Sequence, residues 1–114
     1  MYVYGSLAKD AVVKAVAPTA TELDRFEPAR ASSMFIHLEN RDGAQTCNAW
    51  IESRPKAGTG NWSVSSLTVL DAIIAGEVRG EPIEIAGAGE VRIMATASGA
   101  GLTVWFSRRN VSGE

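Results

Sequence analysis

A single histidine and a single cysteine are the side chains of this sequence best suited to nucleophilic chemistry. An imidazole that removes the proton of a nearby thiol creates the thiolate nucleophile of many hydrolases. His37 and Cys47 lie on consecutive segments of alternating apolar and polar residues. The alternation places Cys47 with the apolar side chains of its segment and His37 opposite those of its own. We therefore expect an exposed histidine and a core cysteine, not a dyad.

Metal and acid–base sites require several suitable side chains at defined spacings. One histidine and one cysteine cannot form a zinc cluster without carboxylates, and none stands at ligand spacing from His37. A pair of carboxylates could hydrolyse a glycoside, but the spacing of the acidic residues selects no pair. These candidates are Glu39, Asp42, Glu52, Glu77, Glu81, Glu84 and Glu90.

One glycine-rich segment partly matches a dinucleotide-binding fingerprint. Gly87-Ala88-Gly89 is followed by Arg92 where the third glycine of the fingerprint would stand, and it precedes a strand pattern in place of a helix. We interpret it as a turn. The sequence thus predicts no catalytic, cofactor-binding or metal-binding residue, and we expect no enzymatic activity and no cofactor.

Three tryptophans are the remaining side chains with a functional signature. Tryptophan combines a large contact area with one hydrogen-bond donor and is enriched at interfaces. Trp50 and Trp105 fall on the alternation phase opposite the small or branched residues of their segments. Together with Trp62 they could contact another subunit or stack on sugar rings, or they could cover the core from outside.

The elements that position these side chains are short segments of alternating residues between Met34 and Ser107. Met34–Glu39 and Thr46–Ser53 alternate on either side of an Asp-Gly pair, which predicts an antiparallel hairpin. Glu90–Ala97 and Leu102–Ser107 alternate around a glycine-containing turn, which predicts a second hairpin. Strands at about ten-residue intervals with turns between them are typical of an all-β antiparallel sandwich or jelly roll.

Two further segments complete the predicted sandwich. Pro55–Asn61 is rich in glycine and begins with proline, so it is predicted to be a loop. Trp62–Ala75 has leucines at helical spacing together with many β-branched residues, and we favour a strand over a helix.

The N-terminal part of the chain has a weaker pattern. Ala11–Ala17 could be a strand, whereas Pro18 and Pro28 interrupt the stretch between them. We interpret residues 1–30 as an irregular arm and crossover within the same domain, residues 31–108 as the sandwich core and residues 109–114 as a C-terminal tail.

Composition limits the classes of partner. With 114 residues, 46% of them hydrophobic, the chain has the size and composition of one globular domain. A net charge of −2 with scattered basic residues disfavours a nucleic-acid partner. The N-terminal residues lack the apolar run of a signal peptide or membrane helix, so we expect synthesis in the cytoplasm and no membrane partner.

The stretch from Ser33 to Ser107 resembles the small jelly-roll proteins that decorate or cement the capsids of tailed bacteriophages. The resemblance is carried by Met34-Phe35-Ile36-His37-Leu38-Glu39, by Gly89-Glu90-Val91-Arg92-Ile93 and by Leu102-Thr103-Val104-Trp105-Phe106. It implies a homotrimer on the capsid exterior that bridges neighbouring major capsid subunits. It also implies contact roles for the N-terminal residues Tyr2, Tyr4, Arg25 and Phe26. The candidate interface residues are these four together with Trp50, Trp62 and Trp105, which were selected by residue type.

Three alternatives remain open on the sequence alone. The chain could be a carbohydrate-binding sandwich that uses its tryptophans as a stacking platform, or a phage tail, fibre or connector component. It could also be an accessory subunit that completes the active site of a partner. The alternation of the strands is common to all three.

Overall fold

The computed structural model describes residues 9–28, 33–85 and 88–110, and for residues 9–11, 65–72 and 110 it describes the backbone alone. The described part of the chain is all β. Eight strands run through it. They are β1 (Lys9–Val16), β2 (Thr21–Phe26), β3 (Ser33–Asn40), β4 (Cys47–Arg54), β5 (Ser63–Ile73), β6 (Val78–Glu84), β7 (Glu90–Ala97) and β8 (Leu102–Asn110). No helix in this part of the chain is long and apolar enough to cross a membrane.

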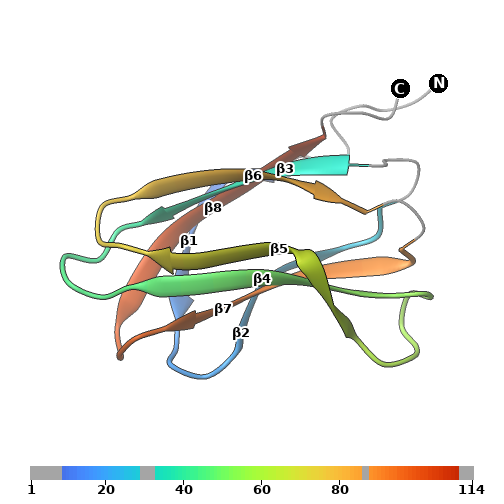
Figure 1. The fold of residues 1–114 in the computed structure, drawn as a ribbon, viewed down its shortest axis with the longest axis horizontal. Helices are drawn as coiled ribbons and strands as arrows, with labels where there is room; N and C mark the ends of the chain where they lie inside the picture. The colour runs from blue at the N-terminus through green and yellow to red at the C-terminus, as the bar shows by residue number, and fades with distance from the viewer. Residues whose placement is uncertain (1–8, 29–32, 86–87, 111–114) are drawn as a thin grey trace.

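The strands form two antiparallel four-stranded sheets that pack face to face (Figure 1). The first sheet has the order β1-β8-β3-β6 and the second the order β2-β7-β4-β5. Strands β1 and β8, β2 and β7, β3 and β6, and β4 and β5 are therefore neighbours, as in a long hairpin rolled up around its middle. This is the strand order of a jelly roll, and it confirms the predicted fold class.

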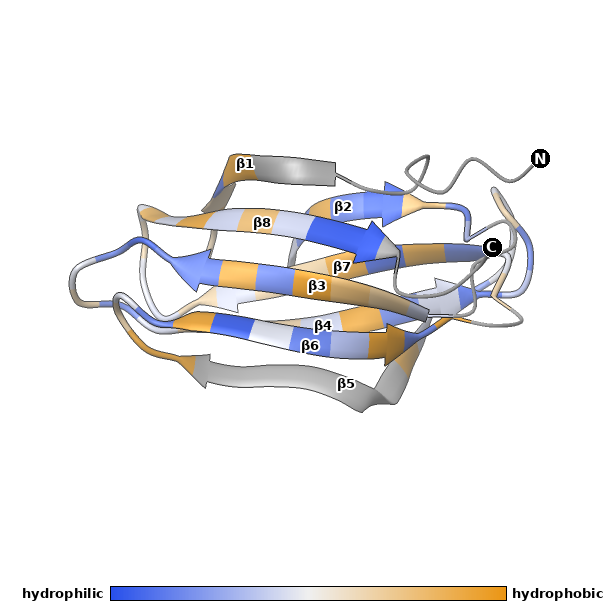
Figure 2. Ribbon diagram, turned by 90° about the horizontal axis from the view of Figure 1, so that it is seen from above, coloured by the Kyte–Doolittle hydropathy of each residue, from blue (hydrophilic) through white to orange (hydrophobic). Residues whose placement is uncertain are grey.

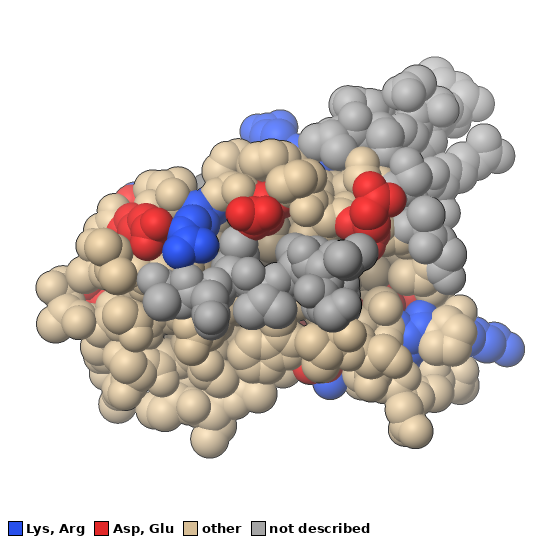
Figure 3. Space-filling view, viewed as in Figure 1, with Lys and Arg blue, Asp and Glu red and all other residues tan. Residues whose placement is uncertain are grey.

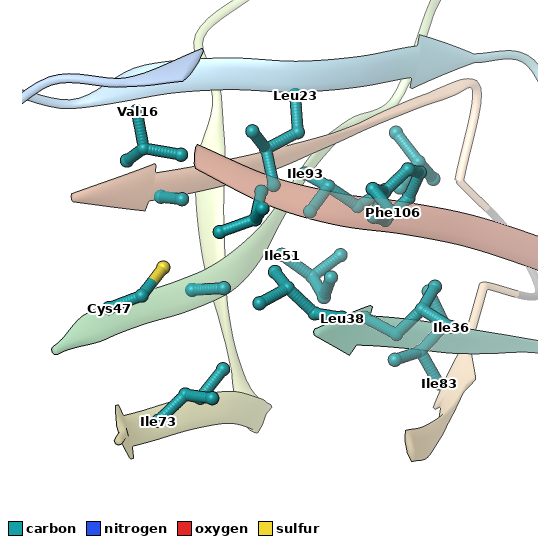
Figure 4. Packing of buried hydrophobic residues seen from close by; sticks show 14 of the residues in the cluster. Val16, Leu23, Ile36, Leu38, Cys47, Ile51, Ile73, Ile83, Ile93 and Phe106 are labelled. Carbon is teal, nitrogen blue, oxygen red and sulfur yellow. The ribbon is translucent and has the colours of Figure 1, made fainter. Parts of the chain in front are cut away.

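The core fills the space between the two sheets and contains the residues that the alternation assigned to it (Figure 4). Met34, Ile36 and Leu38 project inward from β3, and Leu102, Val104 and Phe106 project inward from β8; all six are fully buried. Val91, Ile93, Ala95 and Ala97 from β7 and Cys47, Ala49 and Ile51 from β4 meet them from the second sheet. Period-two alternation therefore identified the buried face of each of these strands.

Both predicted hairpins are wrong, although their strands exist. β3 lies in the first sheet and β4 in the second, and the same holds for β8 and β7. A tight hairpin at Asp42-Gly43 needs positive φ angles, but Gly43 is not among the glycines with positive φ. Asp42 Oδ1 instead accepts hydrogen bonds from the backbone of Ala44 and Gln45, which makes a wider turn that carries the chain to the other sheet.

The segment around Pro18 and Pro28 also differs from expectation. Thr21–Phe26, predicted to be an irregular crossover, is strand β2, and it pairs with β7 at the edge of the second sheet. Leu23 and Phe26 from this strand are buried in the core. The prolines flank the strand and do not interrupt it, which is compatible with their missing N–H donor. The preference for a strand over a helix in Trp62–Ala75 is confirmed by β5.

Asn40 ties three corners of the chain together at the end of the sandwich that carries the short turns. Its Nδ2 donates to the carbonyls of Gln45 at 2.8 Å and Ile73 at 2.9 Å, and its Oδ1 accepts from the backbone N–H of Asp42 at 2.9 Å. Its backbone N–H and carbonyl bond to Glu77 and Gly76. The side chain is fully buried, so these bonds satisfy polar groups that water cannot reach.

An ion pair joins the two sheets toward the opposite end. Arg108 projects inward from β8 and donates through Nε to Asp24 Oδ2 on β2. The side chains of Arg108 and Asp24 are only 10% and 5% exposed, and the Arg108 guanidinium also lies 4.2 Å from the centre of the Phe26 ring. The pair connects β8 to β2 across the core, and either charge alone would be costly at this depth.

We expect Asn40→Asp to destabilise the fold by about 2–4 kcal/mol, because a carboxylate oxygen would replace the donor that faces two buried carbonyls. Urea unfolding followed by tryptophan fluorescence measures the change. Asn61→Asp makes the same substitution at an exposed loop position and serves as the matched control. Equal unfolding free energies for the two variants would contradict the role assigned to Asn40.

Removing one member of the buried ion pair should cost about 3–5 kcal/mol, whereas replacing both Asp24 and Arg108 by leucine and methionine should cost much less. Urea unfolding of Asp24→Asn, Arg108→Met and the double variant Asp24→Leu/Arg108→Met separates these cases. Glu22→Gln, which removes half of the exposed Glu22–Arg25 pair on the same strand, should change stability by about 0–1 kcal/mol. If the single variants are as stable as Glu22→Gln, the pair does not hold the sheets.

Candidate functional site

The two side chains with nucleophilic potential lie on different sheets. Cys47 is fully buried on the inner face of β4, and burial raises the pKa of its thiol to about 11. The thiol therefore stays protonated at neutral pH, which removes its nucleophilicity. His37 is exposed on the outer face of β3, where its ring lies 4.9 Å from that of Phe35. The two residues cannot form a dyad, as the alternation predicted.

The acidic side chains are engaged mainly with arginines. Glu39 pairs with Arg41, Glu77 with Arg79, Glu52 with Arg92 and Glu90 with Arg54. Within the described ranges, no group of three or more His, Cys, Asp or Glu side chains could hold a metal ion. The Glu52–Arg92 and Glu90–Arg54 pairs join neighbouring strands, whereas the other two pairs each join residues two apart in the chain.

The outer face of the second sheet carries a compact network of arginine, glutamate and tryptophan side chains. Arg92 on β7 bonds to Glu52 on β4 at 2.7 Å through Nε, and the indole N–H of Trp50 donates to the same carboxylate at 2.7 Å. On β2, Arg25 pairs with Glu22 at 2.7 Å. The pair of Glu90 and Arg54 also belongs to this network, which therefore contains three glutamates and three arginines. The charges of these described residues balance, so the network is not a charged binding surface.

Trp62 joins the loop between β4 and β5 to this network. The guanidinium carbons of Arg54 and Arg92 each lie 4.3 Å from the centre of its ring, and that of Arg25 lies 5.2 Å away. Cation–π contacts of this kind stabilise by about 0.5–2 kcal/mol each, depending on exposure. The indole is therefore used within the chain to fix the loop on the sheet.

Glu90 holds the middle of the same loop. Its Oε1 accepts from Arg54 Nε at 2.8 Å and from the backbone N–H of Gly58 at 3.1 Å, and its Oε2 lies 4.0 Å from Arg25. The hydrogen bonds from Arg54 and then from Gly58 lower the pKa of the Glu90 carboxyl below its usual range. Next to it, Gly89 approaches the loop so closely that a Cβ would collide with the Pro55 carbonyl.

Trp105 lies on the other side of the molecule, on the outer face of the first sheet. It is level with Val13 on β1 and Glu39 on β3. Arg41, whose Nε lies 3.2 Å from Glu39, stacks its guanidinium 4.4 Å from the centre of the Trp105 ring. The indole is only half covered, because it stands on the solvent side of the sheet.

The residues predicted to form an interface are therefore dispersed. Arg25, Trp50 and Trp62 share the outer face of the second sheet, whereas Trp105 is on the first. The three tryptophans consequently do not form one sugar-stacking platform. Phe26 was expected at a contact surface but is buried in the core beneath Arg108, because β2 turns this side chain inward. Tyr2 and Tyr4 lie outside the described residues.

Sequence reasoning missed the outer face of the first sheet as a surface. Val13 and Val78 are 55% and 57% exposed at its two edges, and Phe35 and His37 lie between them. The alternation does place each of these residues on the outward side of its strand. The sequence could not show that they share one face, because this requires knowing that β1, β8, β3 and β6 are neighbours.

Neither a family model nor a curated protein sequence matches this chain. Among solved structures, it is similar to the SPBc2 prophage-derived protein YomS, with a TM-score of 0.50 and 10% identity over 86% of this chain and 91% of that one. A structure of Bacillus endospore appendages, described as disulfide-linked pili, matches with a TM-score of 0.45 and 15% identity over 90% of this chain and 84% of that one. At such low identity the likeness to YomS shows a shared fold.

We expect Glu90→Gln to destabilise the protein at neutral pH and to have less effect in acid. The pKa of Glu90 is lowered on folding, so its stabilising contribution is present above the ordinary carboxyl pKa and is lost as the pH falls through the folded value. Urea unfolding across this pH range measures the difference from the wild type. Glu84→Gln, at an exposed position on β6, is the control, and a Glu90→Gln effect that is the same at every pH would contradict the assignment.

Proposed function

We propose that this chain is a structural virion protein of a bacteriophage that decorates or cements the capsid from outside, bound between major capsid subunits. It acts through surface contact as a symmetric homo-oligomer, without a chemical step. The fold shared with the prophage-derived protein YomS supports a phage setting. The sequence resemblance to capsid decoration proteins supports the specific role.

The observation that carries the proposal is the contrast between the two outer faces of the sandwich. The second sheet has its arginines, glutamates and Trp62 engaged with one another and with the β4–β5 loop. The first sheet presents Val13, Trp105, Phe35 and Val78, and no described segment crosses over it (Figure 2). Arg41 covers part of the Trp105 ring on this face. A partly apolar face on a small domain is typical of a protein that binds another protein surface, here another copy within the symmetric oligomer.

A cementing role follows from mass action. A protein that binds the assembled shell and not its dissociated subunits stabilises the shell by about 2.7 kcal/mol per occupied site at a free concentration 100 times its Kd. Repeated engagement over many symmetric sites multiplies a modest contact. A small domain without a chemical step is sufficient for this task.

Adding the purified protein to capsids that lack it tests the proposal. We expect saturable binding at a fixed ratio to the major capsid protein and a higher temperature of capsid disruption, measured by sedimentation and by light scattering on heating. Mass spectrometry of purified virions should also detect the chain. Absence from virions together with no binding to capsids would refute the capsid role, and labelling confined to the tail would assign it to a tail, fibre or connector component.

A further inference from the structure

The residues on the outer face of the first sheet form rows across the strands, as the pairing register shows. One row runs from Val13 on β1 through Trp105 on β8 and Glu39 on β3 to Val78 on β6. The next row contains Ser107, His37 and Gly80, and the one after it Arg109, Phe35 and Pro82. The face is therefore an ordered pattern of apolar, aromatic and polar positions.

The centre of this face is shallow. A Cβ on Gly80 would lie 2.7 Å from Cε1 of Phe35 and 3.1 Å from Cδ2 of His37, so the two rings lean into the space that the missing side chain leaves. Ser107 on the other side of His37 is small. The low centre and the exposed valines at both edges suit the approach of a second sheet face.

The edges of the sandwich are poorly suited to strand addition. β1, β2 and β5 contain register shifts, between Lys9 and Val12, between Glu22 and Asp24 and at two places in β5. The fourth edge strand, β6, contains Pro82, and charged side chains gather near it in Figure 3. Bulges, proline and charge are features that keep edges from pairing with other chains. Contact between copies is therefore more favourable through an outer face of a sheet than through an edge strand.

We propose that the outer face of the first sheet pairs with the same face of a second copy of this chain, about a twofold axis that runs parallel to the strands between β3 and β8. This rotation places each row opposite the same row of the second copy, in reversed order. β1 then lies opposite β6 of the second copy, and β8 lies opposite β3. Val13 then meets Val78 of the second copy, and Val78 meets Val13. The pairing is isologous, so every contact occurs twice.

The polar and charged groups of the face are complementary under this operation. Trp105 lies opposite Glu39 of the second copy, whose carboxylate also pairs with Arg41 of its own chain, His37 lies opposite Ser107, and Arg109 lies opposite Phe35. A twofold axis perpendicular to the strands would instead place Glu39 over Phe35 and His37 over His37. Charge complementarity therefore selects the axis parallel to the strands.

The size of the face sets the strength of the pair. Four strands about 4.8 Å apart and about seven residues long, at about 3.3 Å per residue, cover about 450 Å² in each copy. This is below the about 800 Å² per partner of a standard stable interface. We infer a pair that forms reversibly in concentrated solution and becomes persistent only where many copies are held close together. The pairing does not depend on the capsid role.

Analytical ultracentrifugation of the full chain from micromolar to millimolar concentration tests the pair. The mass should rise from the 12.1 kDa of one chain toward twice that value. Val78→Asp or Val13→Lys alone should weaken pairing at least tenfold. The matched control Val64→Asp changes an equally exposed valine, 59% exposed, on the second sheet and should leave pairing unchanged.

Mixing the Val13→Lys and Val78→Asp proteins should restore pairing, because one lysine–aspartate contact and one valine–valine contact then form between the two copies. Rescue within one chain is excluded, since residues 13 and 78 lie on opposite edges of the sheet, three strand spacings or about 14 Å apart. Circular dichroism and thermal unfolding verify that each variant is folded.

A chain that stays monomeric at millimolar concentration, a mass of three chains, a Val64→Asp effect equal to that of Val78→Asp, or no recovery on mixing would each overturn the pairing. Capsid binding by a protein that does not pair would leave the proposed function standing, and pairing by a protein absent from virions would leave this inference standing.

Discussion

The contact between the two apolar inner faces holds this molecule together, and the path of the chain makes it unusually dependent on that contact. Six of the seven connections between the described strands pass from one sheet to the other, and only β4 and β5 are consecutive neighbours within a sheet. Separating the sheets would therefore disrupt almost every corner of the chain. Asn40 at one end and the Arg108–Asp24 pair toward the other hold the sheets in register by satisfying polar groups that water cannot reach.

The sequence predicts those features of the fold that depend on neighbouring residues, and it does not predict those that depend on residues far apart in the chain. The alternation of apolar and polar residues predicts which side of β3, β4, β7 and β8 faces the core. The burial of Met34, Ile51, Ile93 and Phe106 confirms this prediction. Pairing is not local, because a strand with one apolar face fits either neighbour in either sheet. The Asp42-Gly43 signal was misleading for the same reason, since the turn is real but leads across the core. The network around Trp62 combines residues from β2, β4, β7 and a loop, so no sequence spacing could reveal it.

The two outer faces of the sandwich have different roles. On the second sheet, Glu52 and Glu90 neutralise arginines that also surround Trp62, and the β4–β5 loop is fixed there. On the first sheet, aromatic and aliphatic residues form rows that also contain Glu39 and Arg109. Tryptophans occur on both faces, and both Trp62 and Trp105 carry a stacked arginine, so residue type alone did not show on which face each indole lies. The strand order makes that distinction.

Footprinting of surface side chains by carbene labelling and mass spectrometry, with the protein free and then assembled, tests most directly that the first sheet is the contact face. We expect Phe35, Trp105 and Val78 to lose labelling on assembly, while Trp50 and Val64 on the second sheet keep theirs. Protection of Trp50 and Val64 with unchanged labelling of Trp105 would contradict this expectation.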